Sequence, residues 1–503
     1  MKYINKIYKV INMRALIIVL FFVLSQNITA QMQSYSLEDV IKIAQKQSPD
    51  AQIAKHNLVR NYWSYRTYKR SLLPQLDFVG TIPNVNRAYE NYTNPDGSQS
   101  YVGQRYIAYS GELQIKKTIG YTGGSVFLSS GLQKVDNYYD TSATSNYLST
   151  PLNIGISQPL FNYNPYKWSK KIEPLKYDES QRIYIETVET VSLSAVSYYF
   201  RLLKAQMTLS IKELNVQNYD TLYKLAKGRY SLGKIEENDL LQLELKSLQS
   251  QSAQEMARLN YDNALVKFKS FLRLPLSEDI ILKDPKPQDF FIVDKQKALD
   301  MAIKNSSEIL QHNLKLLMAN SELDRAKKAN GFNADLYAVF GFTQNADNLH
   351  AAYQNPKDQQ KVSLGLKIPI YDWGQREGQV IMAESNLEIV KNTVEQQLVD
   401  FKQRIYLEVV KFNMQQNQLY IAAKSDTIAM RAFDITKYKY YNSGKISVTD
   451  LNIAQVSNDQ ARISYINALE TYWNSYYNLR KSTLYDFNNN KLIEVDFDEL
   501  LDR

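Results

Sequence analysis

The stretch Gln379-Val-Ile-Met-Ala-Glu-Ser-Asn-Leu-Glu388 begins a run of 65 residues, ending at Ser443, that contains neither glycine nor proline. Because these two residues interrupt helices most strongly, the run predicts one continuous α-helix. At 1.5 Å per residue such a helix would extend about 97 Å, far beyond any globular core. An earlier run, residues 175–232, contains only Gly228 and no proline. The chain is therefore expected to contain two very long helices.

Apolar residues follow more than one face of these helices. Two sets recur every seven positions in the earlier run, Val188, Ala195, Leu202, Leu209 and Val216 on one face and Leu193, Phe200, Met207 and Leu214 on another. A helix with two apolar seams packs between two neighbours, as in a closed ring of helices. Small residues also recur at heptad spacing in the last helix, at Ala454, Ala461 and Ala468. An isolated two-stranded coiled coil is the simpler alternative, but it explains only one seam.

The sequence also repeats itself. Three pairs of segments match in the same order, residues 39–50 with 297–308, residues 152–162 with 362–372, and Tyr230-Ser-Leu-Gly-Lys-Ile235 with Tyr441-Asn-Ser-Gly-Lys-Ile446. The offset is 258 for the first pair and about 210 for the others, which places an insertion in the first copy between about residues 84 and 150. We expect a first repeat over 31–290, a second over 291–487, and a C-terminal tail over 488–503.

Between the helices of each repeat, the hydrophobic period changes to two. In the second copy Val362, Leu364 and Leu366 alternate with Ser363 and Gly365, and residues 152–160 of the first copy follow the same pattern. Such alternation predicts β-strands, although it does not separate a transmembrane barrel from a soluble sandwich. Four residues are expected at the strand-to-helix junctions, Pro159 and Pro369 ending the strands and Asn162 and Asp372 capping the helices that follow.

The insertion contains one more candidate hairpin, residues 110–132, which turns at Thr122-Gly-Gly124. The sequence leaves open whether this hairpin widens the sheet or projects away from it. Tyrosine-rich segments flank it, and with Asn-Pro-Asp-Gly at 94–97 they predict loops on the outer side of a membrane, an ordinary polar loop being the alternative. These tyrosines are Tyr89, Tyr92, Tyr101, Tyr106, Tyr109, Tyr138, Tyr139 and Tyr147.

Residues 1–30 have the pattern of a secretory signal peptide. Ten apolar residues at 15–24 precede a small residue, Ala30, and only basic charges come before them, at Lys2, Lys6, Lys9 and Arg14. Ten helical residues span about 15 Å, half of a bilayer core, so the pattern favours a cleaved signal over a retained anchor. We expect cleavage after Ala30 and export of the mature chain.

Composition excludes several classes of protein. The 503 residues include no cysteine and three widely separated histidines, so no disulfide scaffold, thiolate metal site or cysteine nucleophile is possible. The net charge of +8 falls to +4 without the first thirty residues, which argues against a nucleic-acid partner. No phosphate-binding loop, zinc motif, calcium loop or nucleophile elbow occurs. We expect neither catalysis nor a cofactor nor a metal, which disfavours a secreted hydrolase.

Four short segments add a family resemblance to these patterns. They are Ser-Leu-Glu-Asp-Val-Ile-Lys-Ile-Ala (36–44), Leu-Leu-Pro-Gln-Leu (72–76), Ile-Ser-Gln-Pro-Leu-Phe (156–161) and Tyr-Asn-Ser-Gly-Lys-Ile-Ser-Val-Thr-Asp-Leu (441–451). Together with the duplicated unit, they resemble the TolC-type outer membrane efflux family over residues 35–487. The resemblance implies a mixed α and β membrane protein with an internal two-fold repeat. It further implies a homotrimer, in which each chain gives about four strands to one outer-membrane β-barrel that a periplasmic α-helical coiled-coil barrel continues.

The same resemblance implies a function and partners. The protein is expected in the outer membrane of a Gram-negative bacterium, in contact with its lipid and extending into the periplasm. It would be a passive exit duct of a tripartite efflux or type I secretion system. A periplasmic adaptor would connect it to an inner-membrane pump of the resistance-nodulation or ABC type, which delivers small molecules or proteins. The alternative is a soluble periplasmic coiled-coil adaptor or structural protein.

The resemblance also assigns residues to the helical tip. The expected gate comprises Asp450, Asp239, Tyr441 and Tyr230, with Asp450 lining the entrance and Asp239 and Tyr441 belonging to a network that holds the tip closed. The expected adaptor-docking turns are Gly233, Lys234, Ile235, Gly444, Lys445 and Ile446. From chemistry alone, the two aspartates belong to first helical turns, where a carboxylate favours the helix dipole. The chain departs from the family where it has Ile446 in place of a basic residue and Ile453 in place of a second carboxylate, although Lys445 and Lys234 lie nearby.

Overall fold

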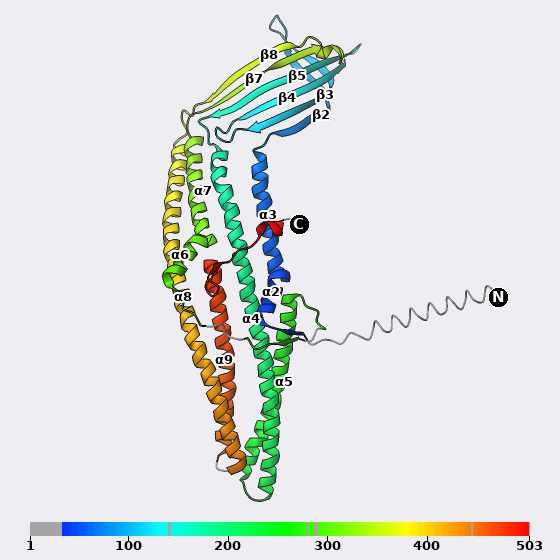
Figure 1. Ribbon diagram of the computed structural model, residues 1–503. Coiled ribbons are helices and arrows are strands. Elements are labelled where there is room, and N and C mark those ends of the chain that lie inside the picture. Colours follow the sequence, from blue (N-terminus) through cyan, green and yellow to red (C-terminus); the bar gives the residue numbers. More distant parts are fainter. Residues whose placement is uncertain (1–32, 139–141, 278–279, 286–289, 444–445, 502–503) are drawn as a thin grey trace, which may run out of the picture. The chain divides into compact units, whose positions relative to one another are not determined.

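The computed structural model describes residues 33–138, 142–277, 280–285, 290–443 and 446–501 (Figure 1). The predicted signal peptide lies outside these residues, as do Tyr139, Gly444 and Lys445. The chain forms two compact units. One, here the sheet unit, comprises Leu58–Arg182 and Ser307–Phe401, and the other described residues form the helix unit. Within the described residues, no helix has both the length and the apolarity that crossing a membrane requires.

The sheet unit contains one antiparallel sheet of six strands (Figure 1). In sheet order the strands are β2 (Gln75–Thr93), β3 (Gln99–Thr118), β4 (Ser125–Tyr138), β5 (Ala143–Leu160), β7 (Asn333–Ala346) and β8 (Lys357–Lys367). The expectation of about four strands per chain is therefore wrong. The hairpin of the insertion, β3 and β4, pairs along its whole length with β2 and β5, so it widens the sheet and does not project from it.

Where the structure describes them, the tyrosine-rich segments are strands and not the predicted loops. Tyr89 pairs with Gly103 and Tyr92 with Ser100 in the ladder between β2 and β3. The connection between these strands is confined to residues 94–98, where Gly97 donates to the carbonyl of Asn94 at 2.9 Å. Tyrosine has a high β-propensity, and continuous pairing satisfies backbone groups that a long loop would leave to water.

The two faces of the sheet differ in polarity. One row of paired residues crosses five strands with apolar side chains, Leu76, Ile115, Leu128, Ile154 and Phe340. The adjacent row faces the other side and is polar or small, with Asp77, Gln114, Ser129, Asn153, Gly341 and Gln359. Every member of the apolar row is solvent-exposed within the single chain. The predicted alternation is thus confirmed, and the apolar row of the sheet is not covered by other described residues of the chain.

The junctions between strands and helices partly follow expectation. Strand β5 ends one residue after Pro159, and β8 ends two residues before Pro369. Asp372 caps α8 (Gln375–Ser443), because its carboxylate accepts the backbone N–H of Arg376 at 2.9 Å. This agrees with its predicted role.

The predicted cap of α4 (Pro165–Ser231) is wrong by two positions. The carboxamide oxygen of Asn164, not Asn162, accepts the backbone N–H groups of Tyr166 and Lys167, at 3.0 and 3.3 Å. Asn162 instead donates to Asp335 at 3.4 Å. The helix starts later because proline occupies its first position, where a missing N–H costs nothing.

Four helical segments of the sheet unit pack in a row below the sheet strands. Helix α3 (Pro49–Ser71) contacts α4 through the rings of Tyr65 and Tyr177, whose centroids are 5.2 Å apart. The indole N–H of Trp168 on α4 donates to Asp324 of α7 (Ser307–Ala329) at 2.8 Å. Helix α7 in turn pairs with α8 through Lys327 and Glu384 at 2.9 Å. The order of contact is therefore α3, α4, α7, α8.

The helix unit contains two long helical hairpins (Figure 1). The later part of α4 leads into α5 (Glu237–Leu272), and the later part of α8 leads into α9 (Val448–Thr483). Both long helices are confirmed, with 67 residues in α4 and 69 in α8. Helices α4 and α9 are joined by an ion pair between Lys204 and Glu470 at 2.7 Å. Smaller elements complete the unit, namely β1 (Gln33–Tyr35), α2 (Leu37–Gln47), β6 (Ile280–Leu282), α6 (Lys295–Asn305), β9 (Tyr485–Asp486), β10 (Lys491–Leu492) and α10 (Phe497–Leu501).

A buried ionic cluster holds the end of α9 against α4. The guanidinium of Arg480 donates two hydrogen bonds to Glu189 on α4, both at 3.0 Å, and one to Asp486 at 2.7 Å. Glu189 and Asp486 are only 1% and 2% exposed. Burial alone would raise the pKa of the Asp486 carboxyl, but hydrogen bonds from Asn489 and the charge of Arg480 outweigh it and hold the pKa below its usual value. The cluster is stable only as a complete set, because each carboxylate needs the guanidinium.

We therefore expect Arg480→Met to destabilise the helix unit by about 3–5 kcal/mol, since it leaves two buried carboxylates without a counter-charge. The measurement is the guanidinium unfolding midpoint followed by far-ultraviolet circular dichroism. The control is Lys224→Met, because Lys224 pairs with Asp220 at 2.6 Å on the surface of α4 and exposed pairs contribute little. Equal midpoints for the two variants would contradict a structural role for the cluster.

Candidate functional site: the helical tip

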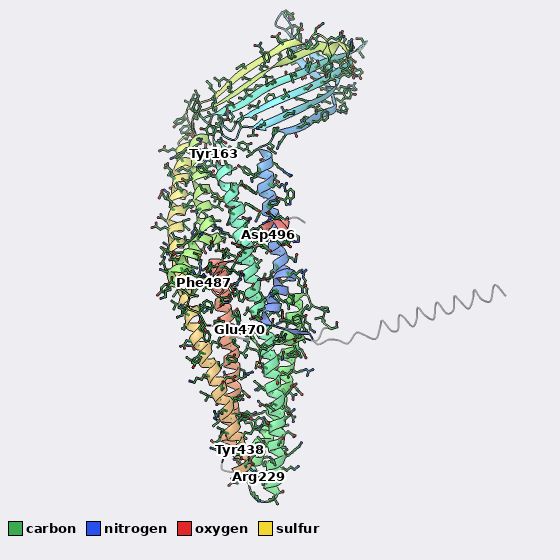
Figure 2. All side chains as sticks on the ribbon, viewed as in Figure 1. Tyr163, Arg229, Tyr438, Glu470, Phe487 and Asp496 are labelled. Carbon is green, nitrogen blue, oxygen red and sulfur yellow. The ribbon has the colours of Figure 1, made fainter. Side chains whose placement is uncertain are left out.

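The tip consists of the turn between α4 and α5 and the turn between α8 and α9. Figure 2 labels Arg229 near the end of α4 and Tyr438 near the end of α8. In the first turn, the N–H of Gly233 donates to the carbonyl of Tyr230 at 2.8 Å, and the N–H of Lys234 donates to that of Arg229 at 2.9 Å. This pair of bonds is the Schellman ending of a helix, and it requires the positive φ of Gly233, +65°. The repeated glycine of the motif is thus explained at this turn by backbone geometry.

The second turn leads into α9 through a capping box. The hydroxyl of Ser447 accepts the N–H of Asp450 at 3.0 Å and donates to the carboxylate of Asp450 at 2.7 Å. The same carboxylate accepts the N–H of Ser447 at 3.3 Å. Asp450 therefore has a structural role at the start of α9, and this serine–aspartate contact fixes its position.

Both predicted aspartates lie where residue chemistry alone placed them. Asp239 is in the first turn of α5 and Asp450 in the first turn of α9, where a carboxylate is favoured by the helix dipole. Both side chains are exposed within the single chain. The two helix starts differ, because Glu236, the N-cap of α5, makes no side-chain capping bond. Only Asp450 is held in place by a cap.

An apolar cluster joins all four helices just above the two turns. Its buried members are Tyr219, Leu222 and Ala226 from α4, Leu243 from α5, Phe433 and Tyr440 from α8, and Leu451 from α9. Ile235 and Ile446, one from each turn, pack against it. The resemblance led us to expect a basic residue at the position of Ile446, and the contact that Ile446 makes here is apolar. Within one chain, the two hairpins are held together here by apolar and aromatic side chains.

The tyrosine that packs in this cluster is Tyr440, next to Tyr441, which the resemblance assigns to the network that holds the tip closed. Tyr440 is 6% exposed, whereas Tyr441 is 36% exposed and contacts only the edge of the cluster through the ring of Tyr440. No hydrogen bond links Asp239 to Tyr441, although the structure describes both residues. Tyr230 is 42% exposed. The predicted gate residues therefore share the tip, but within the single chain they do not form one network.

A signal in the sequence could have identified the apolar cluster. Phe433 and Tyr440 are seven residues apart, and Tyr219, Leu222 and Ala226 have the spacing of one helix face. The seams followed in the sequence end at Val216 and Leu214, one turn before this cluster begins. Among the described residues, no group of three acidic or histidine side chains is arranged to hold a metal ion. The tip therefore combines apolar packing with two exposed carboxylates.

Comparisons with known proteins agree with this architecture. The chain is similar in fold to the Campylobacter jejuni CmeC outer membrane channel, with a TM-score of 0.65, 17% identity, and coverage of 93% of this chain and 88% of that one. It is also similar to the outer membrane protein VceC of Vibrio cholerae, with a TM-score of 0.63, 12% identity and coverage of 89% and 95%. For the open state of the Neisseria gonorrhoeae MtrE outer membrane channel, the TM-score is 0.60, the identity 14%, and the coverage 89% and 88%.

A sequence search among curated proteins finds no match. The sequence profile of the outer membrane efflux protein family, in contrast, matches residues 124–272 and 299–483, more than half of the chain. These two matched ranges include both long helices and both tip turns. The resemblance seen in the short segments is thereby confirmed, and the chain belongs to the outer membrane efflux protein family.

Proposed function

We propose that three copies of this protein form one outer membrane efflux channel, a passive duct for molecules delivered by an inner-membrane pump through a periplasmic adaptor. The observation that carries the proposal is the six-stranded sheet, which has an exposed apolar face and two unpaired edges. Two further observations support it, the exposed apolar seams on the helices and the position of Asp450 at the tip.

The sheet cannot be complete within one chain. Strands β2 and β8 each have a single neighbour, so each leaves a row of backbone groups unpaired. In lipid such edges are untenable, and an exposed apolar face is equally unfavourable in water. Closure with other copies resolves both problems, because the apolar row then faces lipid and the polar row faces the lumen. Three sheets of six strands would give a barrel of eighteen strands, a size that leaves an aqueous channel.

Helix α8 has an apolar seam without a partner in its own chain. Five residues at heptad spacing are 48–62% exposed, Leu407, Met414, Ile421, Ile428 and Ile435. They lie opposite the face that α8 buries against α9, which includes Phe412 and Leu419. A heptad seam of this length is what a coiled-coil neighbour requires.

Helix α5 has a second unpartnered stripe. Its exposed apolar residues are Leu241, Leu245, Leu248, Met256, Leu259 and Val266. Successive members are three, four or seven residues apart, except that eight residues separate Leu248 from Met256. This spacing keeps them along one side of the helix. Because α5 and α8 belong to different hairpins, the α5 stripe of one copy and the α8 seam of the next can cover each other around a ring. The helices would then form a closed tunnel, and the exposed tip turns would be free to dock the adaptor.

In this assembly Asp450 would form a ring of carboxylates at the entrance. Three copies of Asp450 would concentrate negative charge at the entrance and favour cations over anions. Ile453, one turn further along α9, is exposed and apolar, so the second acidic ring of the family pattern would be replaced by an apolar one. The cluster around Tyr440 would restrain the hairpins by packing and not by salt bridges. The alternative, a soluble periplasmic adaptor, does not account for the exposed apolar row of the sheet.

For the assembly, we expect Ile421→Asp combined with Ile428→Asp to give a monomer, because buried, unpaired carboxylates are incompatible with a coiled-coil seam. The control replaces both residues by leucine, which keeps the seam apolar and should leave the trimer intact. Light scattering in detergent measures the mass, and circular dichroism verifies the helix content. A trimer with both aspartates present would show that this seam is not an interface.

For the entrance, we expect Asp450→Asn to shift the reversal potential of the channel toward zero in planar bilayers with a potassium chloride gradient. The reason is the loss of three negative charges from the entrance of the proposed channel. The control is Asp262→Asn, which removes the same charge from α5 far from the tip and should leave the reversal potential unchanged. An unchanged reversal potential for Asp450→Asn would refute the carboxylate ring.

For closure of the tip, we expect Tyr440→Ala to increase the open probability at least about tenfold, because truncating a buried aromatic side chain costs about 3 kcal/mol. Tyr441→Ala, one residue further along, should have little effect. The wild-type channel should open no more often at 1 M than at 0.1 M salt, since screening acts on charges and not on apolar contacts. Salt-dependent opening together with equal behaviour of the two variants would favour an ionic gate.

A further inference from the structure

The helical segments of the sheet unit form a row that has two ends. Helices α4 and α7 have a neighbour on each side, whereas α3 and α8 stand at the ends of the row (Figure 1). If three copies close into one ring, the two end helices must meet, α3 of one copy beside α8 of the next. In the sheet unit, residues 58–71 of α3 and 375–401 of α8 would then form the junction between copies.

The side of α3 that is turned away from α4 is basic. Arg60, Trp63 and Arg70 are three and seven residues apart and lie along one side of the helix, and all three are exposed. Arg66 and Arg70 place their guanidinium groups over the ring of Trp63, at 5.2 and 5.9 Å. Among the described residues, none of the three arginines has a carboxylate within ion-pair distance. Residues 58–71 include four basic residues and no acidic one.

The exposed side of α8 in the sheet unit is acidic. Four exposed residues follow one another there at spacings of four and seven, Glu377, Ile381, Glu388 and Glu395. Glu388 pairs with Lys391 of the same helix at 2.7 Å, an exposed contact that contributes little. As far as the chain is described, Glu377 and Glu395 have no basic side chain within ion-pair distance. Residues 375–401 include five acidic residues and two basic ones.

The opposite charges of these two sides discriminate between the possible contacts of two copies. A two-fold contact brings the same side of both copies together, so arginines would meet arginines or glutamates would meet glutamates. Such a juxtaposition of like charges is strongly unfavourable, whereas α3 against α8 brings opposite charges together. A contact between two different sides, repeated head to tail, generates a ring and not a two-fold dimer. The charges of the end helices therefore favour the ring.

Both sides also carry apolar surface that a partner would cover. Trp63 is 47% exposed in the middle of the basic side. On α8, Ile381, Met382 and Ile389 are 53%, 66% and 63% exposed. Tryptophan and arginine are enriched at the centres of protein–protein interfaces, where an aromatic side chain buries a large area. The basic side of α3 thus has the composition of an interface and not only that of a solvated face.

We propose that ion pairs between α3 of one copy and α8 of the next close the ring of sheet units and direct it head to tail. The basic partners are Arg60, Arg66 and Arg70 around Trp63, and the acidic partners are Glu377, Glu388 and Glu395. The proposal rests on the three-copy channel of the proposed function, and it adds which surfaces join in the sheet unit. Because single exposed ion pairs contribute little, the discrimination depends on the whole set of charges.

The test reverses the charges and measures the mass of the detergent-purified protein by light scattering. The α3 variant combines Arg60→Glu, Arg66→Glu and Arg70→Glu, and the α8 variant combines Glu377→Lys, Glu388→Lys and Glu395→Lys. Each makes the two sides alike in charge, so we expect the concentration at half assembly to rise at least about 100-fold. The sixfold variant that contains both sets should return to a trimer, because opposite charges meet again. Circular dichroism verifies the helix content of all variants.

The control combines Lys170→Glu, Lys171→Glu and Lys176→Glu, which changes the net charge equally on exposed positions of α4, within the row. It should stay trimeric, and a monomeric control would show that net charge decides assembly, which overturns the proposal. Trimers of both triple variants, or a monomeric sixfold variant, would also overturn it while leaving the channel intact. A monomeric wild-type protein without conductance in planar bilayers would instead refute the proposed function itself.

Discussion

The constraint on which the structure depends is the open sheet. Six strands with one apolar and one polar face, and with both edges unpaired, satisfy neither water nor lipid as a single chain. The long helix α8 is also incomplete as a single chain, because it buries one apolar seam against its own chain and exposes a second. Each unit is thus incomplete as a single chain, and the proposed self-association would complete each of them.

The insertion of the first repeat changes more than the number of strands. Its hairpin lies between β2 and β5, and its turn is held by Asn164, the same residue that caps α4. One insertion therefore widens the sheet and adds a turn that is bonded to the start of α4. The second repeat keeps the plain hairpin of β7 and β8, and Asp372 caps α8 there. The two copies of the unit have diverged where the sheet meets the helices.

Much of this fold is visible in the sequence, and the failures have physical reasons. Periodicity and the absence of glycine and proline predict α4, α8 and the strands, because each depends on local pattern. The sequence does not distinguish Asn162 from Asn164 as the cap of α4, because the two residues are identical in type and only the path of the chain between them decides which one reaches the helix start. The apolar cluster of the tip was not part of the sequence prediction, because Tyr440 and Tyr441 are adjacent and identical and only the rotation of α8 decides which of them is buried. The sequence does not show that the additional hairpin joins the sheet, because the alternation along one strand does not specify which strands pair with it.

The most direct test of the account is an image of the detergent-solubilised particle by electron cryo-microscopy, since it reports closure of both units at once. We expect a threefold particle in which three sheets form one barrel of eighteen strands inside the detergent belt. A folded, monodisperse monomer that stays in aqueous buffer without detergent would contradict it.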